Sequence, residues 1–289
     1  PARAAAGPMD LPRQERLDAA YSKSSSTPVV VIIFDEFPLN GLLNNELQID
    51  ATRFPHFSAL VKDATWFRNA AAVNQFTPIA LPAILSGRMP RSLKQLPTVE
   101  SYPTNLFTLL GRSHAITAYE PFTRLCPDDL CRKKVRRTTW RGRVTFMLSD
   151  LAAVYLNYVV PEDVELGLPS IDGKWGDFWE ETTADWDAPN FSRGDRVESF
   201  KRFTRGLKPP ADKPPFIFAH IILPHMPQQF VPSGRIYAPG VMQGYVRDQW
   251  VDDPARREVS YQQFLLQMGA TDRLLGEFIA RLKELGIYD

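Results

Sequence analysis

The distribution of apolar and polar positions along the chain predicts three core strands. The segments 28–34 (PVVVIIF) and 216–223 (FIFAHIIL) are short, rich in β-branched or aromatic residues, and apolar almost throughout. Continuous apolar runs of this length are typical of strands buried on both faces of a parallel sheet. The segment 114–119 (HAITAY) predicts a further strand, which lies between the other two in sequence.

Apolar residues at helical spacing predict the helices that connect and cover these strands. The clearest pattern runs from Tyr261 to Leu282, and Gly286 is a natural cap beyond its end. Shorter helices are predicted at 55–63, 104–110 and 145–158. Because strands and helices alternate, the predicted fold class is α/β, an open and mostly parallel sheet with helices on both faces.

Two parts of the chain lack a periodic apolar pattern. Residues 1–27 are rich in alanine, proline, serine and charge, which predicts a linker. A stretch at about 160–212 is acidic and rich in tryptophan, and we interpret it as an irregular insertion in a domain spanning 28–289. The chain begins at Pro1 and ends where the next strand is expected, so we interpret both ends as cuts and the sheet as incomplete at its C-terminus.

The charge of the chain bears on its partners. The formal net charge is only +1, whereas nucleic-acid-binding domains are normally clearly basic, so no nucleic acid partner is expected. No apolar run approaches the roughly 18 to 20 residues that span a bilayer, which leaves open an anchor upstream of the chain. The basic run RKKVRRTTWRGR (132–143) is either a solvated charged face or a contact for anionic lipid head groups or an anionic polymer.

The only two cysteines, Cys126 and Cys131, lie close together in the sequence CPDDLC. This spacing could close a small disulfide loop outside the cytoplasm. The chemistry alone also allows two reduced thiols or part of a metal site, although no CxxC pair supports the metal site.

An acidic pair, Asp35 and Glu36, directly follows the first predicted strand. In open α/β sheets ligands gather at the carboxyl ends of the strands, so Asp35 is the leading candidate for a metal ligand. The alternative is a solvated loop or a helix cap.

Thr77 precedes Pro78 and an apolar stretch that ends at Ser86. The order favours Thr77 as a helix N-cap with Pro78 at the first helical position. A helix that starts there would direct backbone N–H groups and the positive end of its dipole at an anion near the hydroxyl. Capping alone would also explain a threonine here. Pro82 lacks an N–H one turn later, so a loose or kinked helix is expected.

Four segments, taken in order, resemble the alkaline-phosphatase/sulfatase superfamily. The string TPIALPAILSGR (77–88) is similar to the sulfatase signature C-x-P-S-R-x-x-L-L-T-G-R, and VVVIIFDEFP (29–38) is similar to the first strand with its acidic pair. The segment LPHMP (223–227) is similar to a strand end that reads Pro-His-x-Pro, and 271–289 resembles the helix leading to a later Asp-His metal pair.

The resemblance implies an alkaline-phosphatase-like fold and assigns roles to individual residues. It makes Thr77 the nucleophile and a metal ligand, Asp35 the first metal ligand with Glu36 beside it, and His225 the residue that contacts the transferring group in catalysis. It also implies substrate binding by Arg88 and His220, although His220 is equally well explained as a hydrogen-bonded core histidine. The implied cofactor is a divalent metal, Zn, Mn or Ca.

The resemblance further implies a phospho- or sulfo-ester hydrolase or transferase. Thr77 lacks the Cys or Ser context that formylglycine formation requires, which favours phosphate chemistry of the kind found in phosphodiesterases and in phosphoethanolamine and phosphoglycerol transferases. The implied substrate is an anionic ester, lipid- or polymer-linked, and the implied location is extracytoplasmic with a membrane anchor in the full-length protein.

That location implies a disulfide between Cys126 and Cys131. The Asp-His pair would lie beyond Asp289, so residues 1–289 alone are expected to be inactive. The alternative to an enzyme is a non-catalytic sulfatase-like scaffold or binding module.

Overall fold

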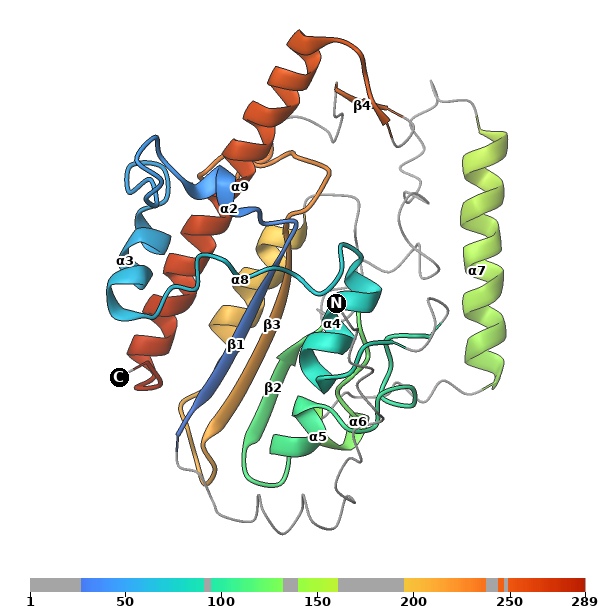
Figure 1. Ribbon diagram of the computed structural model, residues 1–289. Coiled ribbons are helices and arrows are strands. Elements are labelled where there is room, and N and C mark those ends of the chain that lie inside the picture. Colours follow the sequence, from blue (N-terminus) through green and yellow to red (C-terminus); the bar gives the residue numbers. More distant parts are fainter. Residues whose placement is uncertain are drawn as a thin grey trace, which may run out of the picture.

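The computed structural model describes residues 27–90, 95–131, 140–160, 195–237, 244–246 and 249–288. Within these residues β1 (Val29–Asp35), β2 (Ala115–Tyr119) and β3 (Pro215–Pro224) form a parallel sheet in the order β1-β3-β2 (Figure 1). A separate antiparallel ribbon consists of β4 (Tyr245–Val246) and β5 (Gln249–Trp250). The three predicted core strands and the α/β class are therefore confirmed.

Helices lie between and beside these strands. Their bounds are α2 Leu39–Leu42, α3 Pro55–Asp63, α4 Thr77–Ser86, α5 Leu106–Leu110, α6 Asp128–Cys131, α7 Trp140–Val159, α8 Asp195–Gly206 and α9 Pro254–Glu284. The helix predicted from Tyr261 to Leu282 is thus confirmed and longer than expected. It begins after Asp253, whose carboxylate accepts hydrogen bonds from the backbone N–H groups of Ala255 and Arg256.

The central strand β3 is buried along its whole length because helices cover both faces of the sheet. Side chains of a strand alternate between the two faces. Phe216 and Phe218 pack on one side with Phe107 of α5 and with Leu85 of α4. The intervening residues pack on the other side with α8 and α9, in a cluster that includes Ile217, Ala219, Ile221, Phe200 and Phe278.

Helix α8 corrects one sequence-based expectation. Residues 195–206 fall inside the stretch interpreted as irregular, yet they form a helix whose Val197, Phe200 and Phe203 are buried against the sheet. These three residues recur at helical spacing, and that was the signal for the helix. Residues 1–26 of the predicted linker (1–27) and the greater part of the predicted insertion, 161–194, lie outside the described residues.

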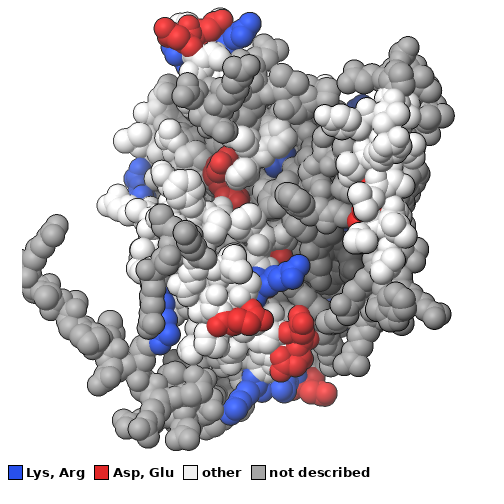
Figure 2. All heavy atoms as spheres, turned by 90° about the vertical axis from the view of Figure 1, so that its right-hand side faces the viewer, with Lys and Arg blue, Asp and Glu red and all other residues white. Residues whose placement is uncertain are grey.

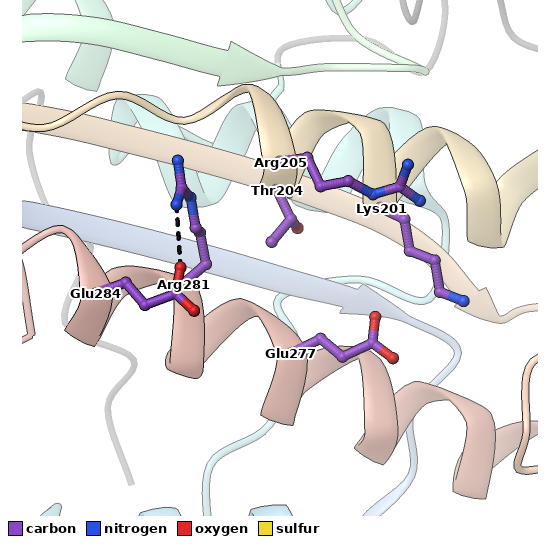
Figure 3. A pocket seen from close by; sticks show the side chains of 6 residues that line it. All are labelled: Lys201, Thr204, Arg205, Glu277, Arg281 and Glu284. Carbon is purple, nitrogen blue, oxygen red and sulfur yellow. Dashed lines mark hydrogen bonds and ion pairs between the residues drawn. The ribbon is translucent and has the colours of Figure 1, made fainter.

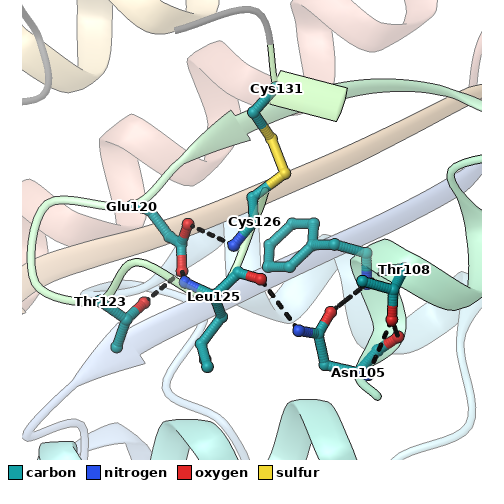
Figure 4. Close-up of a disulfide and its surroundings, with 8 residues drawn as sticks. Asn105, Thr108, Glu120, Thr123, Leu125, Cys126 and Cys131 are labelled. Atoms are coloured by element: carbon teal, nitrogen blue, oxygen red, sulfur yellow. Dashed lines mark hydrogen bonds between the residues drawn. A yellow bond between two sulfur atoms is a disulfide. The ribbon is translucent and has the colours of Figure 1, made fainter. Parts of the chain in front are cut away.

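The loop after β2 is held by a buried carboxylate and by the disulfide between Cys126 and Cys131 (Figure 4). Glu120, at the end of the strand, accepts hydrogen bonds from the Thr123 hydroxyl and from the backbone N–H groups of Leu125 (2.8 Å) and Cys126 (3.1 Å). Asn105, which caps α5, also donates to the Leu125 carbonyl at 2.9 Å. These contacts fix the loop on the face of the sheet that α5 covers.

Candidate active site

The strand pattern places Asp35 and His220 on the same face of the sheet. On β1, Val29, Val31 and Ile33 pack with the apolar cluster on the α4 and α5 side, and Asp35 is the next residue in that alternation. On β3, His220 continues the alternation that begins with Phe216 and Phe218. Helix α4 covers this face, and its first residue lies beside Asp35.

Thr77 is the first residue of α4, and its hydroxyl contacts Asp35. The Oγ1 atom lies 3.2 Å from each carboxylate oxygen of Asp35, and we take it as the donor because the carboxylate can only accept. The expected proximity of the two residues is thus confirmed. The N-cap interpretation is wrong, because the cap position is Phe76 and no side chain caps the helix there. The Thr77 hydroxyl therefore does not cap the helix, and it contributes instead to a cluster of polar side chains around Asp35.

The residues that follow Thr77 in the signature-like sequence lie along α4 and beyond its end. The chain accommodates Pro82 inside the helix, where its carbonyl accepts a hydrogen bond from the Ser86 hydroxyl at 2.6 Å. Gly87 ends the helix with a φ of +66°, a value that favours glycine. Arg88 is exposed and lies two residues beyond Ser86, the last residue of the helix, which is about 13.5 Å along the helix axis from Thr77 at about 1.5 Å per residue. The structure therefore does not bring Arg88 into the cluster with Thr77.

His220 is buried beside Asp35 without a hydrogen bond. Its side chain is 1% exposed, and its Nε2 atom lies 3.3 Å from Asp35 Oδ2, within ion-pair distance but not aligned for a hydrogen bond. In the part of the chain that the structure describes, neither ring nitrogen has a hydrogen-bond partner. The expectation of a hydrogen-bonded core histidine is therefore not met. A buried polar atom without a partner lowers the stability of the fold.

The environment of Asp35 favours its ionised form. Burial acts to raise the pKa of this carboxyl, but His220, and to a smaller extent His225 and the Thr77 hydroxyl, outweigh it and hold the pKa below the ordinary value of 3.8. Asp35 is consequently a carboxylate at neutral pH. Its negative charge lies at the carboxyl end of the sheet, where a cation would be stabilised.

Glu36 contacts His225 rather than Asp35. Its backbone has a φ of +56°, a left-handed conformation that is uncommon for a non-glycine residue and is often found at functional sites. One carboxylate oxygen of Glu36 lies 3.3 Å from His225 Nε2, and the other accepts a hydrogen bond from the Met226 N–H at 3.3 Å. These contacts give Glu36 a role in orienting the His225 loop, which differs from the expected metal ligation.

Two buried polar side chains hold the loop that carries His225. Arg196 of α8 donates to the carbonyl groups of Ile222, His225, Met226 and Pro227. Gln267 of α9 donates to the carbonyl groups of Pro224 (2.9 Å) and His225 (2.8 Å). Burial lowers the pKa of Arg196 to about 10, partly offset by Glu36 and Tyr119, so its guanidinium remains charged at neutral pH.

Neither Arg196 nor Gln267 was among the residues that the sequence pattern indicated as functional. Gln267 interrupts the apolar face of α9 between Phe264 and Met268, and a polar residue on such a face was the signal for it. Arg196 lies in the first turn of a helix in a stretch interpreted as irregular, and nothing in the sequence marks it as a loop-binding residue.

The donors of the cluster fit a divalent cation in kind but not in number. Asp35 and Thr77 offer oxygen atoms, which suit Mg²⁺, Mn²⁺ and Zn²⁺. Among the described residues, however, no group of three or more histidines, cysteines, aspartates or glutamates is placed to hold a metal ion. A complete site would need further ligands from outside these residues.

A charged crevice on the other side of the sheet contains none of the expected site residues (Figure 3). It has a volume of about 420 Å³ between α8 and α9, and its lining is Lys201, Thr204, Arg205, Glu277, Arg281 and Glu284. Arg281 pairs there with Glu284 at 3.0 Å. Three basic and two acidic side chains line this crevice, so its charge is mixed rather than of one sign.

Charged side chains on another face of the protein are also mixed. In Figure 2, the described acidic and basic residues of that face occur in small groups, without one extended patch of a single sign. The N-terminus of α4 is a local feature that would attract an anionic ester.

No model of a known protein family matches this chain, and a search among curated proteins also finds no match.

Proposed function

We propose that this chain carries the nucleophile of a phosphoester hydrolase or transferase with an alkaline-phosphatase-like fold, and that Thr77 is the nucleophile. The observation that carries the proposal is the contact of the Thr77 hydroxyl with both oxygens of Asp35, at the carboxyl ends of the strands. The hydroxyl is not needed to cap its helix. The order of the sequence segments that resemble the superfamily supports the same assignment.

Asp35 would orient the nucleophile rather than remove its proton. A general base works best with a pKa near the working pH, whereas the pKa of Asp35 lies below 3.8. A divalent cation, when bound, would lower the pKa of the threonine hydroxyl. The proposal therefore includes further metal ligands from outside the described residues.

The remaining steps are assigned to residues of the same sheet edge. The N-terminus of α4 favours the negative charge of a phosphoryl group beside Thr77. The Thr77 hydroxyl would release its proton to solvent as its Oγ1 atom attacks. As the bond between Oγ1 and phosphorus forms, the bond from phosphorus to the leaving oxygen breaks, and His225 in its protonated form donates a proton to that oxygen.

Water or an acceptor hydroxyl then releases the phosphoryl group from Thr77. In the release step His225 would take a proton back from the attacking water or hydroxyl, and the Thr77 oxygen would regain one from solvent. Whether water or an acceptor hydroxyl acts decides between a hydrolase and a transferase.

The direct test is to trap the covalent intermediate in the full-length gene product. Phosphate mono- and diesters and aryl sulfates would be supplied with Mn²⁺ or Zn²⁺, and the acid-quenched protein would be digested and analysed by mass spectrometry. A phosphoryl-bearing modification on Thr77 is expected, with a control threonine such as Thr52 unmodified. Turnover without any modification of Thr77, or a sulfo-adduct only, would contradict the proposal. No turnover of any ester would favour the non-catalytic scaffold.

A further inference from the structure

Helix α7 presents a continuous apolar stripe to solvent. The helix is 20 residues long, and large apolar side chains on it are between 40% and 89% exposed. They are Val144, Met147, Leu148, Leu151, Val154, Tyr155, Tyr158 and Val159. Soluble monomers seldom expose contiguous apolar patches of this kind, and such patches mark sites of interaction with proteins or membranes.

The spacing of these residues makes them one face of the helix. At 100° per residue they fall within an arc of roughly 140°. Ser149, Ala153 and Leu156 lie on the opposite side, and they are the less exposed positions, with Ala153 fully buried. The helix therefore turns its apolar face outward, the reverse of a helix that covers a core. In Figure 1, α7 stands apart from the sheet and from α8 and α9.

We propose that α7 lies on the surface of a membrane that contains anionic lipids, with this stripe inserted at the boundary of head groups and acyl chains. The sequence directly before and at the start of the helix, 132–143, contains seven lysines and arginines and no acidic residue. An amphipathic helix combined with basic residues is the combination that binds anionic membrane surfaces.

The composition of the stripe favours lipid over a second copy of the chain. Tyr155 and Tyr158 are amphipathic aromatic residues, which are enriched at membrane interfaces. The apolar arc is also wider than the narrow seam of a two-helix coiled coil. Among the described helices, none is long and apolar enough to cross a membrane, so α7 is assigned to lie along the surface. This proposal does not depend on the proposed enzymatic function.

The test is flotation of residues 1–289 with lipid vesicles. Vesicles of phosphatidylcholine with phosphatidylglycerol are expected to carry the protein to the top of a density gradient, and vesicles of phosphatidylcholine alone to carry much less. Binding should weaken as salt is raised, because salt screens charges at the surface. The variant with Leu148→Glu and Leu151→Glu is expected to lose at least tenfold in partitioning. That size follows because each buried methylene contributes a factor of about four.

A matched variant has the same two changes elsewhere on the surface. Leu47→Glu with Leu96→Glu replaces two leucines that are at least as exposed, and it should float like the wild type. The single variant Tyr158→Ser, at the most exposed position of the stripe, provides a milder change. Circular dichroism and thermal unfolding check that each variant is folded.

Three results would overturn the proposal. The first is wild-type protein that binds neither kind of vesicle. The second is equal flotation of wild type and the Leu148→Glu, Leu151→Glu variant. The third is a dimer in sedimentation analysis that this variant abolishes, because a second copy would then cover the stripe.

Discussion

Two carboxylates lie at the ends of the strands that flank β3, and they have different surroundings. Glu120 follows β2 and is buried, and its oxygens accept hydrogen bonds from backbone N–H groups of its own loop. Asp35 ends β1, and it contacts side chains, the Thr77 hydroxyl and the His220 ring. A carboxylate that binds the backbone of its own loop therefore stabilises that loop, whereas a carboxylate surrounded by reactive side chains is a candidate for chemistry.

The loops beside these carboxylates differ in the same way. A disulfide closes the loop after β2, and two buried side chains from α8 and α9 bind the carbonyl groups of the loop after β3. The second arrangement leaves the His225 ring partly exposed while its backbone is fixed. A rigid backbone beneath an accessible ring is what a positioned acid or base requires.

Replacement of Thr77 is expected to have the largest effect. In the full-length gene product, Thr77→Ala should lower kcat by several orders of magnitude because the nucleophile is lost, whereas Thr77→Ser should retain part of the activity. In contrast, Glu120→Gln should affect stability far more than kcat in the folded fraction. Steady-state kinetics on folded protein separate the effects of the Thr77 and Glu120 variants. Wild-type turnover by Thr77→Ala would mean that the surroundings of Asp35 are no more catalytic than those of Glu120.

Replacement of Arg196 should be the most damaging change to stability. Arg196→Met keeps much of the volume but leaves the carbonyl groups of the His225 loop without their buried donor, and a cost of about 3 kcal/mol or more is expected. Arg205→Met on the same helix removes an exposed guanidinium and should change the unfolding free energy by less than about 0.5 kcal/mol. Urea unfolding of both variants measures the difference, and equal midpoints would show that the loop does not depend on Arg196.

The disulfide should contribute less than Arg196. It closes a loop of five residue steps, for which chain entropy predicts about 2 kcal/mol. Cys126→Ala with Cys131→Ala is therefore expected to lower the unfolding free energy by that amount and to leave the His225 loop unaffected. A loss of activity in the folded variant would show that the loop after β3 depends on the loop after β2, contrary to this expectation.

The sequence predicted the strands and most helices because continuous apolar runs and helical spacing report burial directly. It also predicted the neighbourhood of Asp35 and Thr77, since both lie in segments whose order resembles a known family. It could not predict that Glu36 turns away to His225, because this depends on a left-handed backbone at one residue. Nor could it predict Arg196, whose role depends on four carbonyl groups that only the folded loop brings together.

The smallest predicted effect concerns the pH dependence of two carboxyl groups, the partly buried Asp35 and the buried Asp272. The pKa of Asp35 lies below 3.8, whereas burial raises the pKa of Asp272. The hydrogen bonds that Asp272 accepts from the backbone N–H groups of Phe57 and His56 act to lower its pKa, but burial outweighs them. For Asp35, the folded protein binds its proton less readily than the unfolded chain, so its contribution to stability is complete above about pH 4 and is lost as the pH falls through the folded-state pKa. For Asp272 the sign is reversed, because the folded state holds the proton more tightly and the contribution is lost as the pH rises from about 4 towards the raised pKa.

Unfolding free energies of Asp35→Asn and Asp272→Asn, measured from pH 3 to pH 7, would test these signs. The stability difference between wild type and Asp35→Asn should shrink towards acid pH, since asparagine does not titrate. The difference between wild type and Asp272→Asn should shift in favour of the wild type towards acid pH. Only the slopes are compared, because each substitution also changes hydrogen bonds by an amount that does not vary with pH. If the unfolding free energies of wild type and Asp35→Asn changed in parallel with pH, the side chains around Asp35 would not stabilise its charge. The physical basis for distinguishing Asp35 from a purely structural carboxylate would then be lost.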